Sequence, residues 1–160
     1  MLAVENETIL HASPPKVWTA LTRFEDYGRW NPFIRIDGPL AQGALVQYSF
    51  RMKADKARFF TVDARITELE PQKQIAFRFG LGRLFAFEES YFLAPVPVGS
   101  RLVHSFRYTG LLSAIKFGKV RRNFGQMLEI TDRLFQRHLR PARPPTSAKK
   151  RVRKGFRPDA

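Results

Sequence analysis

The sequence predicts an α+β fold in which a curved antiparallel sheet wraps around a long C-terminal helix. Three patterns predict it: short helical segments after a first strand, about six alternating segments from Phe33 to Thr109, and apolar residues at steps of three and four from Ser113 to Leu139. A sheet of that many strands twists and curls, so its concave face needs a cover. Only the last helix is long enough to provide that cover.

The N-terminal segment should form one strand and two short helices. The strand is expected from Val4 to His11. Ser13 can cap a helix that opens with two prolines, and a second short helix is expected over residues 24–29. The proline after Asn31 disfavours helical backbone at that residue, so the chain should leave the second helix in an extended conformation.

The middle of the chain changes to a period of two. Apolar and polar side chains alternate in each segment, which is typical of an antiparallel sheet with one solvated face. The expected strands are Phe33–Asp37, Ala44–Lys53, Arg58–Leu69, Lys73–Phe79, Phe85–Leu93 and Arg101–Thr109.

The C-terminal helix carries two glycines on nearly the same side, Gly118 and Gly125. Each costs about 1 kcal/mol relative to alanine inside a helix. Such glycines either let another backbone approach or leave room for a ligand, and the pattern leaves both interpretations open. Small residues such as Ala44 and Ala64 among the inward phenylalanines favour an elongated apolar cavity between sheet and helix.

Composition limits the class of protein. The 160 residues, 44% of them hydrophobic, are enough for one domain with a real core. The absence of cysteine excludes disulfides and thiolate sites. The first residues lack a signal-peptide pattern, and no segment approaches the roughly 20 apolar residues of a membrane span. We therefore expect a cytoplasmic protein, with peripheral membrane attachment as a further possibility.

The positive charge is concentrated at the C-terminus. The formal net charge is +14, and residues 140–160 hold eight Lys or Arg against one Asp. We therefore predict a folded domain over residues 1–139 and a basic, disordered tail over residues 140–160. The tail could bind an anionic membrane, bind nucleic acid, or only aid solubility. The basic residues available for such binding are Lys149, Lys150, Arg151, Arg153, Lys154 and Arg157.

Five motifs occur in order between residues 4 and 139. They are Ala12-Ser-Pro-Pro-Lys-Val-Trp18, Phe24-Glu-Asp-Tyr-Gly-Arg-Trp-Asn-Pro-Phe33, Phe92-Leu-Ala-Pro95, Gly99-Ser-Arg-Leu-Val-His104 and Gly110-Leu-Leu112. Together they resemble the START-like, Bet v 1-like (SRPBCC) superfamily, closest to its bacterial polyketide cyclase/dehydrase-like and lipid-transport-like branch. The resemblance implies a helix-grip fold, but it is a poor guide to activity, because the superfamily includes carriers, allergens and cyclases.

The resemblance also bears on individual residues. Trp30 and Asn31 match the family's N-terminal signature. In the family, the residues of this signature have a mostly structural role around the cavity mouth. His104 matches a histidine often found on the family's last strand. Phe106 stands where the family often has an acidic residue, which removes a polar group from the interior and weakens any acid/base mechanism that would use it.

Glu89 and His104 are the candidate catalytic pair. By strand alternation both side chains should point toward the interior. They lie on two strands that a hairpin would place side by side. Such a pair could move a proton in a cyclase or dehydratase reaction, or it could be a structural pair whose members satisfy each other. No metal-ligand spacing links His11, His104 and His138, and no cofactor motif is found.

The favoured hypothesis is a binding or transport protein for a hydrophobic small molecule such as a lipid, isoprenoid or polyketide-like compound. Access would require the Trp30–Pro32 turn and residues 110–113 to move apart. The residues expected to line the site are Trp30, Asn31, Tyr48, Phe50, Phe60, Phe77, Phe87, Tyr91, His104, Phe106, Tyr108, Phe117, Val120, Phe124 and Leu128.

Overall fold

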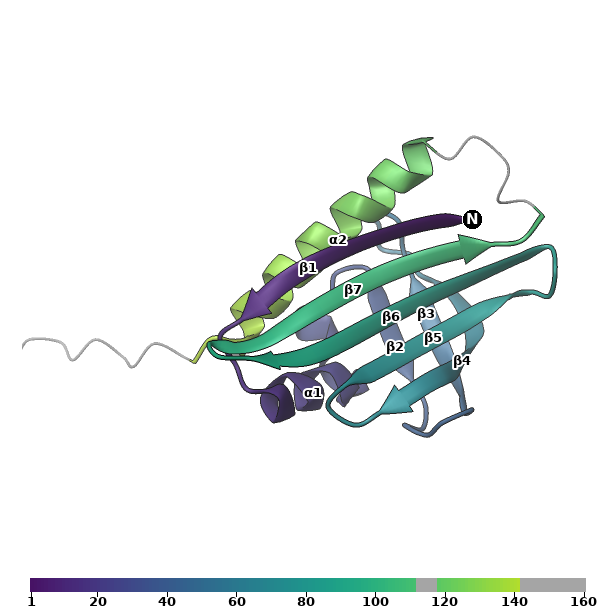
Figure 1. The fold of residues 1–160 in the computed structure, drawn as a ribbon. Coiled ribbons are helices and arrows are strands. Elements are labelled where there is room, and N and C mark those ends of the chain that lie inside the picture. The colour runs from purple at the N-terminus through teal and green to yellow at the C-terminus, as the bar shows by residue number, and fades with distance from the viewer. Residues whose placement is uncertain (112–117, 142–160) are drawn as a thin grey trace, which may run out of the picture.

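The computed structural model describes residues 1–111 and 118–141 (Figure 1). The predicted tail and Phe117 lie outside the described residues, apart from residues 140 and 141. The chain runs β1 (Leu2–Leu10), α1 (Pro14–Thr22), a 3₁₀ helix η1 (Phe24–Arg29), β2 (Ile34–Asp37), β3 (Leu45–Phe50), β4 (Phe60–Glu70), β5 (Gln74–Leu81), β6 (Phe85–Val96), β7 (Gly99–Thr109) and α2 (Gly118–Leu139). This order matches the predicted one. The second short helix is 3₁₀ rather than α.

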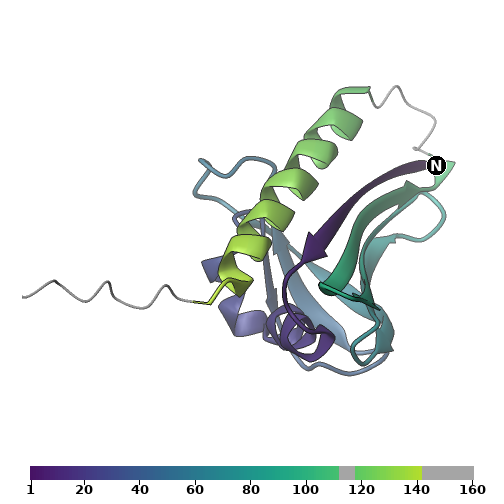
Figure 2. The ribbon, with the colours of Figure 1, turned by 60° about the vertical axis from the view of Figure 1, so that its left-hand side comes forward.

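The seven strands form one antiparallel sheet with the order β1-β7-β6-β5-β4-β3-β2. Each strand pairs with its sequence neighbour except β1, which lies beside β7 at one edge. The sheet curls, and α2 lies along its open side (Figure 2). This is the predicted helix-grip fold, and the structure confirms it.

The pairing between β4 and β5 is incomplete. β4 pairs with β3 over Phe60–Arg65 but with β5 only over Arg65–Glu70, with a register shift between Ile66 and Glu68. The first half of β4 therefore has β3 as its only hydrogen-bonded neighbour. This leaves an opening in the sheet between β4 and the end of β5.

One end of the interior is tightly packed by aromatic residues from the N-terminal helices. The Trp30 ring lies between the rings of Tyr27 and Phe135, with centroid distances of 4.6 and 4.5 Å. Phe24 packs edge-on against Phe77 of β5 at 5.8 Å. The motif that contains Phe24, Tyr27 and Trp30 thus closes one end of the curled sheet. Phe135 packs α2 against it.

Gly125 of α2 faces β1. A Cβ at this position would lie 3.8 Å from Cγ1 of Val4, an ordinary van der Waals distance, whereas a Cβ at Gly118 would meet no atom of the described residues within 4 Å. Within residues 1–111 and 118–141, no backbone lies so close to Gly125 that a side chain there would be excluded. For Gly125, close backbone approach is therefore wrong.

None of the helices in the described ranges combines the length and the hydrophobicity needed to cross a bilayer.

Replacing Gly125 by alanine should stabilise the fold. The new methyl group fits against Val4 and removes the conformational cost of glycine in a helix, so Gly125→Ala should raise the free energy of unfolding by about 0.5–1 kcal/mol. Urea titration measures this. Gly99→Ala is the matched control and should destabilise, because Gly99 has φ +143° and its Cβ would lie 2.2 Å from the carbonyl oxygen of Leu10. A destabilising Gly125→Ala would contradict the assigned packing.

Candidate functional site

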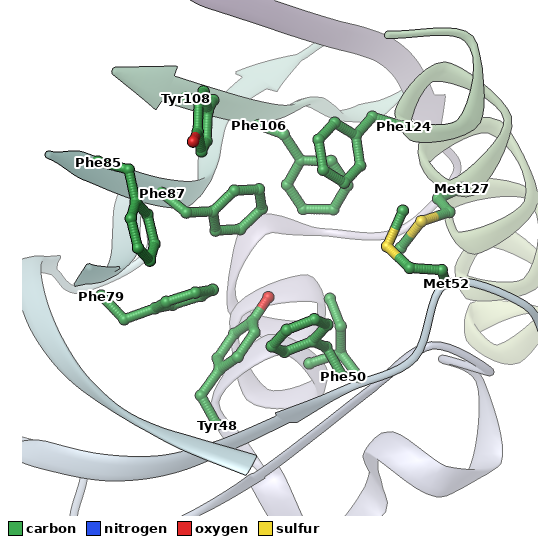
Figure 3. Close-up of a pocket in the computed structure, with 11 residues that line it drawn as sticks. Tyr48, Phe50, Met52, Phe79, Phe85, Phe87, Phe106, Tyr108, Phe124 and Met127 are labelled. Atoms are coloured by element: carbon green, nitrogen blue, oxygen red, sulfur yellow. The ribbon is translucent and has the colours of Figure 1, made fainter. Parts of the chain in front are cut away.

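An apolar cavity of about 160 Å³ lies between the concave face of the sheet and the first half of the described part of α2 (Figure 3). Inward positions of β3, β5, β6 and β7 supply most of its wall, because alternate residues of a strand point to the same face. Its lining residues are Ile34, Tyr48, Phe50, Met52, Phe79, Phe85, Phe87, Phe106, Tyr108, Phe124 and Met127.

Eight of the eleven described residues that line the cavity are aromatic. Phe87 packs against Phe79, Phe106 and Phe124 at centroid distances of 5.0 to 5.6 Å, so one ring joins the sheet to the helix. Two tyrosines, Tyr48 and Tyr108, contribute to the wall, and the hydroxyl of Tyr48 donates to Glu89. An apolar cavity of about this size tends to stay dry and to accept a benzene-sized molecule.

A buried cluster of charged side chains lies next to the cavity. His104 of β7 lies between two acidic side chains. Its Nε2 is 2.9 Å from Oε1 of Glu89, which β6 contributes. Its Nδ1 lies 2.8 Å from Oδ1 of Asp132, which α2 contributes. All three side chains are at most 2% exposed. The cluster therefore ties two strands and the helix together.

Further hydrogen bonds complete the cluster. The hydroxyls of Tyr48 and Tyr91 donate to the two oxygens of Glu89 at 2.6 and 2.9 Å. The Asn6 amide donates to Oδ2 of Asp132 at 2.6 Å. Each oxygen of the two buried carboxylates thus has a donor, which is the condition for burying charge at tolerable cost.

His104 is held in its charged form. Both ring nitrogens face carboxylates, so both donate only when the ring is protonated. Burial alone would lower the pKa of His104, but the charge of Asp132 and the hydrogen bonds to Asp132 and Glu89 outweigh burial and raise that pKa from 6.5 to about 9. Burial, followed by the charge of Glu89, raises the pKa values of Tyr48 and Tyr91. The hydroxyls therefore stay protonated as donors.

The predicted lining residues fall into several groups. The structure places Tyr48, Phe50, Phe87, Phe106, Tyr108 and Phe124 around the cavity. It brings Glu89 and His104 together as predicted, but neither lines the cavity. Tyr48 and Phe106 separate them from it, since both line the cavity and both contact the pair. Tyr91 also belongs to the buried cluster, where its ring stacks on His104 at 4.1 Å.

Other predicted lining residues are structural. Trp30 packs between Tyr27 and Phe135, so the expectation that its turn forms the mouth of the cavity is wrong. The side-chain oxygen of Asn31 accepts the backbone N–H groups of Phe33 and Ile34 at 2.9 and 3.0 Å, which stabilises its own turn.

Four further residues of the predicted set also lie elsewhere. Phe77 and Leu128 are fully buried in the core, and Val120 is partly buried outside the lining. By strand alternation Phe60 should point inward, yet its side chain is 55% exposed. Phe60 lies at the start of β4, where this strand is not paired with β5.

Sequence reasoning missed Asp132 and Asn6. Asp132 follows Leu128 by four residues and precedes Phe135 by three, so it lies on the apolar stripe of the helix. An acidic residue on that stripe was the available signal for a buried partner. Phe106 removes an acidic group from the last strand, but α2 supplies one to the interior at Asp132. Sequence reasoning also missed Ile34, Met52, Phe79, Phe85 and Met127 as lining residues.

The sequence model of the polyketide cyclase / dehydrase and lipid transport family matches residues 1–140. No curated protein sequence matches the chain. Among solved structures, protein MLL2253 from Mesorhizobium loti is similar with a TM-score of 0.62 at 20% identity, over 85% of this chain and 98% of that one. Ara h 8.0201 is similar with a TM-score of 0.65 at 14% identity, over 86% and 97%. Identities this low show the shared fold alone.

The stability of the protein should fall as the pH rises from about 6.5 to about 9. The pKa of His104 is higher in the folded state than the unfolded value of 6.5, so its contribution is complete below pH 6.5 and is lost as pH rises through about 9. At 1.36 kcal/mol per pKa unit the loss is on the order of 3 kcal/mol. Urea titrations between pH 6 and pH 9 measure it.

His104→Gln should remove most of this pH dependence and destabilise the fold by about 3–5 kcal/mol at pH 7, because two carboxylates lose their buried counter-charge. His138→Gln, at an exposed position of α2, is the control and should keep the wild-type profile. A wild-type stability that stays constant from pH 6.5 to 9 would contradict the assigned charge of His104.

Proposed function

The chain belongs to the polyketide cyclase / dehydrase and lipid transport family, and within that family we propose that it binds an apolar small molecule as a carrier or binding protein rather than as an enzyme. The membership confirms the resemblance seen in the motifs. The bound molecule would be a lipid, isoprenoid or polyketide-like compound with its apolar part in the cavity under α2.

The aromatic lining of the cavity is the observation that carries this proposal. Its wall offers ring faces and edges from both the sheet and α2, and Tyr48 commits its hydroxyl to Glu89. The side chains of the wall are aromatic or aliphatic apart from the hydroxyls of Tyr48 and Tyr108, which suits an apolar ligand better than a reacting polar group. Affinity would come mainly from removing apolar surface from water, at about 25 cal/mol per Å².

The cyclase or dehydratase alternative has less support. Glu89 and His104 are fully buried, and their hydrogen-bonding atoms are occupied by each other, Asp132 and two tyrosines. A general acid or base has to come within hydrogen-bond reach of the proton it transfers. A substrate in the cavity would first have to displace Tyr48 or Phe106, which favours binding over catalysis.

We place one opening of the cavity between Met52 and Met127, whose side chains lie next to each other at its edge (Figure 3). Met52 is 39% exposed and follows β3, whereas Met127 belongs to α2. Methionine side chains are flexible and adapt to irregular apolar shapes. A ligand could therefore pass here with side-chain rotation.

Filling the cavity should weaken binding. Phe124→Trp adds volume to the wall that α2 provides, so it should weaken the binding of the neutral probe N-phenyl-1-naphthylamine at least tenfold, at a stability cost of about 1–3 kcal/mol. One ring of this probe fits the cavity, and the rest would extend out through the opening beside Met52. Fluorescence titration measures the affinity. Phe92→Trp makes the same change at a position of β6 that is 36% exposed, outside the lining, and should leave binding unchanged. Equal affinity of both variants and the wild type would overturn the proposed site.

A further inference from the structure

The size of the cavity limits what it can hold alone. Its volume of about 160 Å³ suits a single ring or a short chain segment. Pockets that enclose a typical small ligand measure roughly 300–1,000 Å³. A lipid-like molecule bound here must therefore extend out through an opening.

The incomplete pairing of β4 and β5 provides such an opening through the sheet. Beyond the Arg65–Arg78 pair, the two strands no longer form a ladder, and β5 continues with β6 alone. Gly80 makes this course possible: it has φ +156°, and a Cβ there would lie 2.3 Å from the carbonyl oxygen of Phe85. Only glycine allows β5 to stay this close to β6 while it leaves β4.

The ring of Phe79 separates the cavity from the outer face at this opening. Phe79 lines the cavity, and it also lines two grooves outside it, of about 290 and 560 Å³. The larger groove shares Phe50 and Phe85 with the cavity as well. Rotation of one partly buried phenylalanine ring would therefore join the interior to a groove of ligand size.

The outer end of the opening carries two arginines. Arg65 and Arg78 are exposed and lie directly opposite each other on β4 and β5, and both line the smaller groove. Like charges in this position repel each other. Neither guanidinium forms an ion pair with an acid in the described part of the chain, although Arg65 donates to the carbonyl oxygen of Gly43.

The other polar groups of the groove leave this positive charge largely available. Asp63 lines the groove as well, with its carboxylate accepting the Gln47 amide. Glu88 lies opposite Arg78 on the far side, where it also faces Arg107. The hydroxyl of Thr67, another lining residue, finds no hydrogen-bond partner among the described residues. The groove thus offers two cations and an unused hydroxyl.

We propose that the ligand is an amphipathic anion whose carboxylate binds Arg65 and Arg78 on the outer face while its apolar chain passes Phe79 into the cavity. This rests on the proposed function and adds the chemical class of the ligand and its orientation. Arginine suits the role because its planar guanidinium matches a carboxylate.

Decanoate and decan-1-ol test the headgroup, because they share an apolar chain and differ in charge. Both should displace N-phenyl-1-naphthylamine from the wild type, with decanoate binding more tightly. The double variant Arg65→Gln/Arg78→Gln should bind decanoate about tenfold more weakly and decan-1-ol as before. Arg107→Gln, an exposed arginine on the same face of β7, should change neither affinity. Equal loss for both compounds, or no loss for decanoate, overturns the headgroup site. If neither compound displaces the probe, the proposed function fails.

Protection of introduced thiols from alkylation can test the route of the ligand's apolar chain, because the protein has no cysteine of its own. Leu45→Cys places a thiol in the smaller groove opposite Arg65, and Met52→Cys places one at the opening beside α2. Decanoate should slow the alkylation of the first severalfold and have little effect on Val98→Cys, a distant exposed control. Protection of Met52→Cys without protection of Leu45→Cys would overturn the route between β4 and β5.

Discussion

The buried contact of His104 with Asp132 and Glu89 sets where α2 lies over the sheet. It joins β6, β7 and α2 in the interior, and Asn6 extends it to β1. Burying ions costs several kcal/mol each unless charges and hydrogen bonds are matched, so this arrangement tolerates little displacement. The position of α2 is thereby fixed near Asp132, one helical turn before Phe135 contacts Trp30.

This anchoring divides the interior into two parts. Around Asp132 and Phe135, the helix packs against polar partners and the aromatic residues of the N-terminal helices. Toward Phe124 and Met127, the same helix covers the cavity, where aromatic rings leave space. Tyr48 connects the two parts, since its ring lines the cavity and its hydroxyl belongs to the charged cluster. The part around Asp132 and Phe135 can thus hold the helix in place while the part around Phe124 and Met127 accommodates a ligand.

The periodicity of the sequence predicted the fold because strand alternation and the helical stripe are local properties. It also predicted that Glu89 and His104 meet, since hairpin register follows from the turn. It missed Asp132, because which helical position faces a given strand depends on how the helix rotates and slides over the sheet. Phe60 was misplaced for a similar reason, because strand alternation gives the face of a residue but not its distance from the helix. Trp30 and Asn31 were placed at the cavity mouth by the family resemblance and not by periodicity. The opening beside Gly80 depends on where two strands separate, which alternation does not encode.

The apolar space between α2 and the sheet can be probed with a crystal of the protein pressurised with xenon, because xenon occupies dry apolar cavities without polar contacts. A xenon atom should bind among Phe87, Phe106 and Phe124. Aromatic rings packed flush in that region, with no xenon bound, would contradict the presence of this space.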